Sequence, residues 1–126
     1  MPKRVHSGEG IIGGALPFSQ VIEANGFVFL AGQVGDAPGT PGPVAGGIEA
    51  ETRQMLENVG RLLRAVGLDY SDVVKATVYL RDFEEFAAMN AVYREYFPFE
   101  PPTRATVGVT RLAADYRVEI EVLAAR

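Results

Sequence analysis

The chain has 126 residues, a size typical of one compact domain, and 48% of them are hydrophobic, enough to build a core. The net charge of −4 and the scattered basic residues disfavour nucleic acid and anionic membranes as partners, and the absence of cysteine excludes disulfides, thiolate metal ligands and a cysteine nucleophile. No run approaches the roughly 20 apolar residues of a membrane span, and no signal-peptide core follows the N-terminus. We therefore expect a single domain, residues 1–126, in the cytoplasm, whose reducing conditions suit a chain without cysteine.

The first predicted elements are two strands joined by a tight turn. Residues 20–24 and 27–31 flank Asn25-Gly26, a dipeptide that favours a two-residue hairpin because both residues accept positive φ. The second run is apolar throughout, which indicates that both of its faces are covered, by helices or by a partner subunit. Residues 34–47 follow, and their prolines and glycines predict a long loop.

An amphipathic helix and a further strand are predicted next. From Ile48 to Val66, apolar residues recur at spacings of three and four, with glutamates and arginines on the opposite side. Gly67 is placed to end this helix in the left-handed conformation. Residues 73–80 are β-branched and mostly apolar, which predicts a strand.

A second helix is predicted after Asp82, which forms the pattern of a capping box with Glu85. Asn90 lies on the apolar stripe of this helix, either as a satisfied link to the sheet or as an amide that orients a ligand. Prolines end the helix, and residues 101–109 and 117–122 read as two closing strands. The fold class is therefore α+β, a mixed β-sheet with two helices packed on one face.

Arg104 and Glu119 are charges within these apolar closing strands. Strand alternation places Thr106 on the same face as Arg104 and puts Glu119 opposite the apolar face of the last strand, so we expect these polar groups to converge across adjacent strands. An arginine can bind a carboxylate through two parallel hydrogen bonds, which indicates a carboxylate site. The alternative is a plain salt bridge from Arg104 to Glu119 or Glu121, which spacing alone slightly favours.

The sequence predicts neither a metal site nor a cofactor. His6 is the single histidine and lies near the terminus, so it has no second imidazole with which to bind a metal. Lys75 lies in a predicted strand without a phosphate-binding glycine loop, which disfavours a Schiff base with pyridoxal phosphate.

Four segments together resemble the YjgF/RidA family of enamine/imine deaminases. They are Pro17–Gln20, Ala31–Gln33, Asn90–Phe97, and Pro102–Arg104 with its continuation in Val118–Ile120. The resemblance implies a RidA-like fold, similar to that of the trimeric chorismate mutases, and a homotrimer with sites at the subunit interfaces. It also implies cofactor-independent hydrolytic deamination, a hydrolase reaction at a C–N bond, in which 2-enamines react through their 2-imino acid tautomers to give 2-oxo acids and ammonia.

The resemblance also implies roles for individual residues. Arg104 would hold the substrate carboxylate, and Glu119 would orient and help deprotonate the water that attacks the imine carbon. Asn90 matches an asparagine that lines the family's cleft, and the backbone near Gly32 and Val107 would contribute donors. Because an imine is already electrophilic, these groups need to supply mainly orientation and proton transfer.

Three residues depart from the family pattern. Phe18 stands where many active members have tyrosine and Ala31 where many have serine, so two hydroxyls are lost, whereas Thr106 replaces a cysteine and retains a hydroxyl that can hold water or substrate. These departures predict a preference for bulkier or more apolar imino acids. They also leave open a non-catalytic trimeric binder of small carboxylates; a chorismate mutase is the less favoured third hypothesis.

Overall fold

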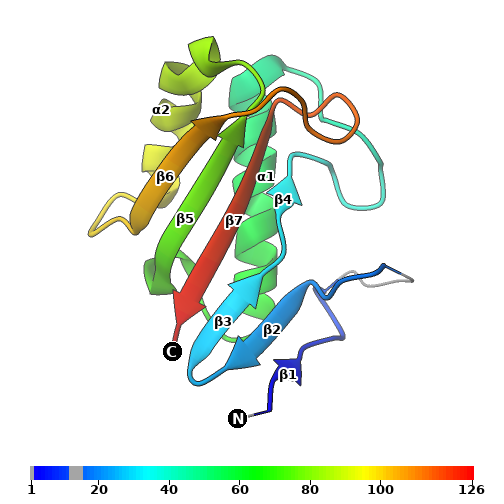
Figure 1. Cartoon of the computed structure of the whole chain (residues 1–126), viewed down its shortest axis with the longest axis vertical. Helices are drawn as coiled ribbons and strands as arrows, with labels where there is room; N and C mark the ends of the chain where they lie inside the picture. Colours follow the sequence, from blue (N-terminus) through cyan, green and yellow to red (C-terminus); the bar gives the residue numbers. More distant parts are fainter. Residues whose placement is uncertain (1, 12–15) are drawn as a thin grey trace.

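The computed structural model describes residues 2–11 and 16–126 (Figure 1). Its strands are β1 (Arg4–Val5), β2 (Val21–Ala24), β3 (Phe27–Leu30), β4 (Gln33–Val34), β5 (Val73–Leu80), β6 (Thr103–Gly108) and β7 (Val118–Ala125). Its helices are α1 (Gly47–Ala65) and α2 (Phe86–Tyr96), and the short 3-10 turns η1 (Tyr70–Asp72) and η2 (Phe83–Glu85) precede β5 and α2.

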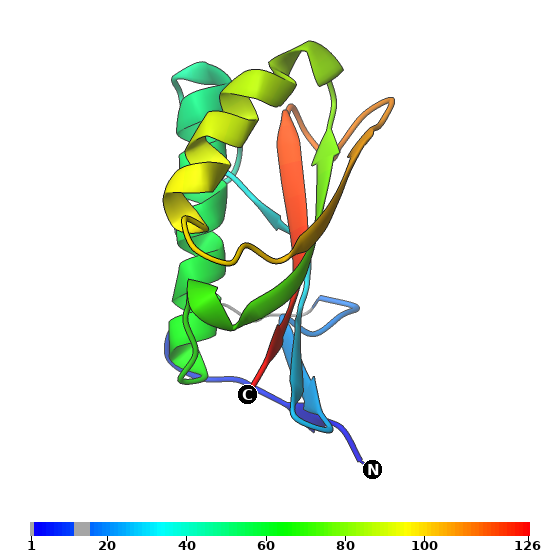
Figure 2. The same cartoon turned by 90° about the vertical axis from the view of Figure 1, so that its left-hand side faces the viewer.

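The strands form one mixed sheet in the order β1-β2-β3-β7-β5-β6, and β4 pairs with β7 beside this path. β5 and β6 are parallel because the chain crosses back through α2 between them, whereas β7 is antiparallel to β3, β4 and β5. Both helices cover the same face of the sheet (Figure 2). The predicted fold class is confirmed.

Two local predictions about chain reversals are also confirmed. Asn25 and Gly26 have φ values of 53° and 80° and join β2 to β3, as a type I′ hairpin turn requires. Gly67 has φ of 80° directly after α1, and the N–H of Leu68 donates to the carbonyl of Leu63 at 2.9 Å. This Schellman arrangement satisfies carbonyls that the end of the helix would otherwise leave unpaired.

The predicted capping box at the second helix is wrong in detail. The Asp82 carboxylate accepts from the backbone N–H of Glu84 at 3.0 Å and caps η2, so α2 begins only at Phe86. Glu85 does not complete the box, because its carboxylate pairs with the guanidinium of Arg117 at 2.7 Å. A tertiary ion pair thus replaces the local interaction that the sequence pattern favours.

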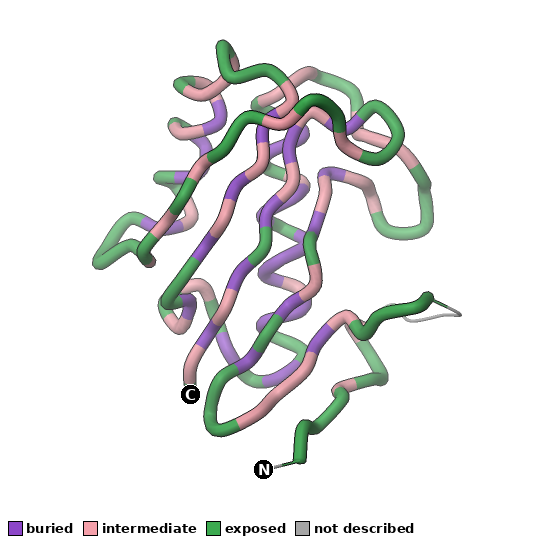
Figure 3. The backbone as a smooth tube through the Cα atoms, viewed as in Figure 1, coloured by how far each residue is buried: buried purple, intermediate pink, exposed green. Residues whose placement is uncertain are grey.

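The core lies between the sheet and the two helices, and Figure 3 shows its buried segments along the strands and the helices. α1 contributes several of the largest fully buried side chains: Met55, Leu56, Leu62 and Leu63. Burying each such side chain stabilises the fold by about 1.5–3 kcal/mol relative to leaving it in water. None of the helices in the described part of the chain is long and apolar enough to cross a membrane.

The opposite face of the sheet is open. Along β3, Val28 and Leu30 are buried under the helices, but Phe27 and Phe29 point the other way and are 44% and 46% exposed. Val107 on β6 is 40% exposed. The prediction that the apolar second strand is covered on both faces therefore holds within one chain for one face only.

Candidate functional site

The predicted site residues lie on opposite faces of the sheet. In the strand register Arg104 pairs with Ala76 of β5, a buried residue under the helices, whereas Glu119 pairs with Tyr79, which points to the open face. β5 also lies between β6 and β7. The expectation that Arg104 and Glu119 converge across adjacent strands is therefore wrong for a single chain. Their strands β6 and β7 are not neighbours, and the two side chains lie on opposite faces of the sheet.

Arg104 lies in a cleft of about 600 Å³, here called the arginine cleft, between α2 and the start of β6. It is lined by Asn90, Tyr93, Arg94, Phe97, Pro98, Pro101, Pro102 and Arg104. The prolines that end the second helix therefore also form a wall of this cleft. The structure places Arg104 and Asn90, two of the residues that the resemblance implies bind substrate, in the lining of the same cleft.

The guanidinium of Arg104 contacts aromatic rings instead of a carboxylate. Its central carbon lies 4.6 Å from the centre of the Tyr93 ring and 5.6 Å from that of Phe86. Among the described residues no ion pair involves Arg104, so the alternative of a salt bridge to Glu119 or Glu121 is not realised. Its N–H donors remain available to a ligand carboxylate.

Thr106 follows Arg104 on the helix-facing side of β6, where it pairs with buried Val78. Its hydroxyl oxygen is buried and has no hydrogen-bond partner within residues 2–11 and 16–126. Thr106 is not among the residues that line the arginine cleft. Its predicted catalytic role stays a prediction.

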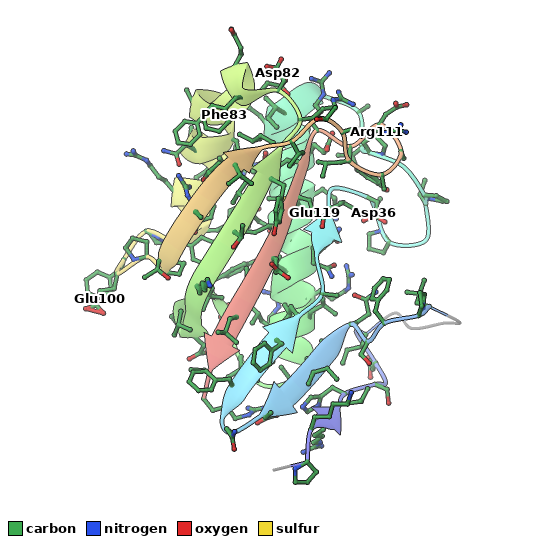
Figure 4. All side chains as sticks on the ribbon, viewed as in Figure 1. Asp36, Asp82, Phe83, Glu100, Arg111 and Glu119 are labelled. Carbon is green, nitrogen blue, oxygen red and sulfur yellow. The ribbon has the colours of Figure 1, made fainter. Side chains whose placement is uncertain are left out.

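The other predicted residues line a second cleft, of about 510 Å³, on the open face. This glutamate cleft is formed by Phe18, Ser19, Ile22, Phe29, Leu30, Ala31, Gly32 and Glu119. Figure 4 labels Glu119 on β7, the strand that pairs with both β3 and β4. Phe18, Ala31 and Gly32, distant from Glu119 in sequence, thus lie around one carboxylate in a largely apolar lining.

Burial raises the pKa of the Glu119 carboxyl, and the neighbouring charge of Glu121 raises it further. Gly32 lies directly against this group, since a Cβ at that position would overlap a carboxylate oxygen of Glu119. A larger residue there would displace the carboxylate. The glycine therefore leaves the space that the Glu119 carboxylate occupies in this cleft.

Gln33 holds the backbone beside Glu119 and was missed by reasoning from the sequence. Its buried side-chain amide donates to the carbonyls of Ala31 and Gly32 at 3.0 and 3.2 Å and to the side-chain oxygen of Gln20 at 3.1 Å. These bonds fix the segment between β3 and β4. The short motif Ala31–Gln33 was the available signal, because a glutamine next to glycine in an apolar strand needs buried partners.

Glu51 is a second positioning residue that was missed. It is 1% exposed, and one carboxylate oxygen accepts from the backbone N–H groups of Arg117 and Val118 at 2.6 and 3.3 Å. Burial raises its pKa, and the two N–H donors oppose that shift. Because Glu51 anchors the start of β7, it helps to position Glu119. In the sequence, a glutamate on the apolar stripe of the helix, one turn before Met55, was the signal for a buried carboxylate.

Metal ligation finds no support in residues 2–11 and 16–126, where no group of three or more histidine, cysteine, aspartate or glutamate side chains could hold an ion. His6 lies away from both clefts, where its Nε2 contacts the carboxylate of Glu23 at 2.9 Å.

The α+β domain thus has two clefts of small-molecule size. One contains the guanidinium of Arg104 and the other the partly buried carboxyl of Glu119, groups suited to small polar ligands. The family model described as endoribonuclease L-PSP matches residues 12–126. The chain belongs to this family, which is the YjgF/RidA family, and the predicted resemblance is confirmed.

Named relatives agree with this assignment. A RutC family protein of Pyrococcus horikoshii is 48% identical over 108 residues, 86% of each chain, and a 2-iminobutanoate/2-iminopropanoate deaminase of Capra hircus is 42% identical over 86% of this chain and 79% of its own. The crystal structure of E. coli TdcF with bound serine has a TM-score of 0.88 and 33% identity, covering 98% of both chains. The fold and family are thus shared with proteins named as imine deaminases.

Proposed function

We propose that this chain is a cofactor-independent deaminase that hydrolyses 2-imino acids, and the 2-enamines in equilibrium with them, to 2-oxo acids and ammonia. The observation that carries the proposal is Arg104, a guanidinium held in a cleft with its N–H donors free of any carboxylate partner in the described chain. The names of the deaminase relatives support it. So does the serine in the E. coli TdcF crystal structure, because serine carries the carboxylate that an arginine clamp would bind.

The proposal includes a homotrimer in the cytoplasm, with sites at the subunit interfaces. Arg104 and Glu119 face opposite ways from one sheet, so one chain cannot direct both at one small substrate. The open face exposes Phe27, Phe29 and Val107, apolar surface suited to burial against another copy. A closed ring of three copies would bring the arginine cleft of one subunit to the glutamate cleft of the next.

In the proposed reaction, Arg104 holds the carboxylate of a protonated imine while Glu119 accepts a proton from water. The water oxygen bonds to the imine carbon, and the electron pair of the C=N bond moves to nitrogen. Glu119 then returns its proton to that nitrogen and the C–N bond breaks. As ammonia leaves, the deprotonated Glu119 accepts the hydroxyl proton, the carbonyl of the 2-oxo acid forms, and this proton passes to the departing ammonia to give ammonium. The raised pKa of Glu119 suits both steps, because a base whose pKa is nearer neutrality can also serve as the acid.

A non-catalytic carboxylate binder is the second candidate, favoured by the phenyl and methyl groups of Phe18 and Ala31 in the glutamate cleft, where hydroxyls could hold water. The family description raises a ribonuclease as a further possibility. The net charge of −4 disfavours it, because phosphate backbones are bound mainly through basic surfaces. The single histidine also contacts Glu23 outside both clefts and offers no base there.

The test mixes the purified protein with an amino-acid oxidase that releases imino acids and follows the remaining imine as its semicarbazone. We expect faster imine loss with the protein present, abolished by Arg104→Ala and retained by Arg111→Ala, a matched change at an exposed arginine outside both clefts. Calorimetry with 2-oxobutanoate runs in parallel. Binding that depends on Arg104 without imine turnover would identify the non-catalytic binder; RNA cleavage without imine turnover would support the ribonuclease.

A further inference from the structure

The two rings that hold Arg104 both come from α2 and are themselves fixed. Phe86 stacks on Phe83 with ring centres 5.3 Å apart and an interplanar angle of 21°. Tyr93 packs on Phe97 at 4.7 Å and is 5% exposed. Arg104 therefore lies against two rings that each pack on a further ring, unlike an isolated surface arginine, whose long side chain samples many rotamers.

We propose that Tyr93 and Phe86 are positioning residues, an aromatic clamp that fixes the plane of the Arg104 guanidinium for a ligand carboxylate. The nature of the ligand rests on the proposed function. Stacking uses the face of the guanidinium and leaves its N–H donors, which lie in the plane, free to form two parallel hydrogen bonds. A carboxylate neighbour would also have fixed the arginine, but it would have occupied the same donors.

The hydroxyl of Tyr93 separates the contribution of the ring from that of the polar group. It is buried and makes no hydrogen bond of good geometry among the described residues. Burial raises the pKa of this hydroxyl, and the nearby Arg104 guanidinium opposes that shift, so any contact between the two groups is weak. Removing a buried hydroxyl that makes at most a weak contact with Arg104 costs little, because no hydrogen bond of good geometry is lost. Tyr93→Phe therefore keeps the clamp, whereas Tyr93→Leu removes the ring and retains an apolar side chain.

The test measures the affinity of 2-oxobutanoate by calorimetry, together with kcat and KM for imine hydrolysis. We expect Tyr93→Phe to bind within about twofold of the parent and Tyr93→Leu to bind about tenfold more weakly, the range of a cation–π contact. In Tyr93→Leu, KM should rise while kcat falls less than about threefold, because Arg104 still contacts the carboxylate once the substrate is bound. Phe86→Leu should have a smaller effect, since its ring is farther from the guanidinium.

Val92→Ala is the matched control for damage to the helix. Val92 is 3% exposed on α2 but does not line the arginine cleft, so this variant should lose thermal stability and keep its affinity. Side-chain NMR of the ligand-free protein adds a direct readout. The Arg104 protons should be shifted by the ring currents in the parent and in Tyr93→Phe, and the Tyr93 contribution should disappear in Tyr93→Leu.

Each remaining outcome gives a decision. Parent-like affinity of Tyr93→Leu, equal weakening by Val92→Ala, or failure of the parent to bind any 2-oxo acid would overturn the clamp. If the parent binds 2-oxobutanoate without hydrolysing imines and the variants behave as expected, the clamp stands and the proposed reaction fails. If imines are hydrolysed and Tyr93→Leu leaves KM unchanged, the reaction stands and the clamp fails.

Discussion

The arginine cleft and the glutamate cleft use opposite charges in opposite ways. Arg104 lies on aromatic rings that leave its charge and its donors intact, whereas Glu119 lies among apolar side chains that raise its pKa. In direct contact, a guanidinium and a carboxylate would pair and occupy each other's hydrogen-bonding groups. Their separation keeps the arginine free to bind a carboxylate and the glutamate free to exchange a proton. It also places the two groups in different clefts of one chain.

The largest expected effect tests whether Glu119 transfers protons while Arg104 binds the substrate carboxylate. Glu119→Gln should lower kcat for imine hydrolysis by about 10²–10⁴-fold, the range typical of a general base, while 2-oxobutanoate still binds through Arg104. Kinetics and calorimetry on the same preparation measure the two quantities. Glu84→Gln, at an exposed residue outside both clefts, should change neither. A large loss of affinity with unchanged kcat would reverse the roles of the two clefts.

A second prediction asks whether the two clefts meet between subunits. Arg104→Ala and Glu119→Gln chains, each inactive alone, should recover activity when they are co-expressed. In random trimers a site needs an intact arginine from one subunit and an intact glutamate from the next, so about a quarter of the sites should be complete. Activity measured against total protein checks this fraction. No recovery despite demonstrated mixing would show that no site combines the two clefts.

Some features of the fold and of the two clefts could be predicted from the amino-acid sequence, and others could not. The hairpin at Asn25-Gly26 and the end of α1 at Gly67 were predictable because glycine and asparagine act through local backbone conformation. The short motifs contain six of the predicted site residues, and each of these lines one of the two clefts, whereas Thr106 lies outside the motifs and lines neither cleft. The relative placement of Arg104 and Glu119 was not predictable, because alternation fixes faces within a strand but not the order in which distant strands pair.

A third prediction concerns the pH dependence that the glutamate cleft alone should impose. Glu119 acts as a base only when deprotonated, so its raised pKa moves the loss of activity on acidification to higher pH than for an ordinary glutamate. Glu121→Gln removes the neighbouring negative charge, so the pKa of Glu119 should fall and the acidic limb of kcat should move to lower pH. The effect should be modest, because burial is the larger cause. A pH–rate profile of both proteins measures it; a shift to higher pH would contradict it.

The smallest expected effect concerns the apolar lining of the glutamate cleft. Phe18, Ile22, Phe29 and Ala31 surround Glu119 there, so leucine- and phenylalanine-derived imino acids should be preferred over 2-iminopropanoate. Ala31→Ser adds a hydroxyl to this lining and should shift the ratio of kcat/KM values about threefold toward 2-iminopropanoate, since small changes in an apolar pocket discriminate weakly. Ser71→Ala, at an exposed position on η1, is the control. Equal kcat/KM values for all side chains in the parent would mean that the substrate side chain lies outside this cleft, so that the apolar lining sets no preference.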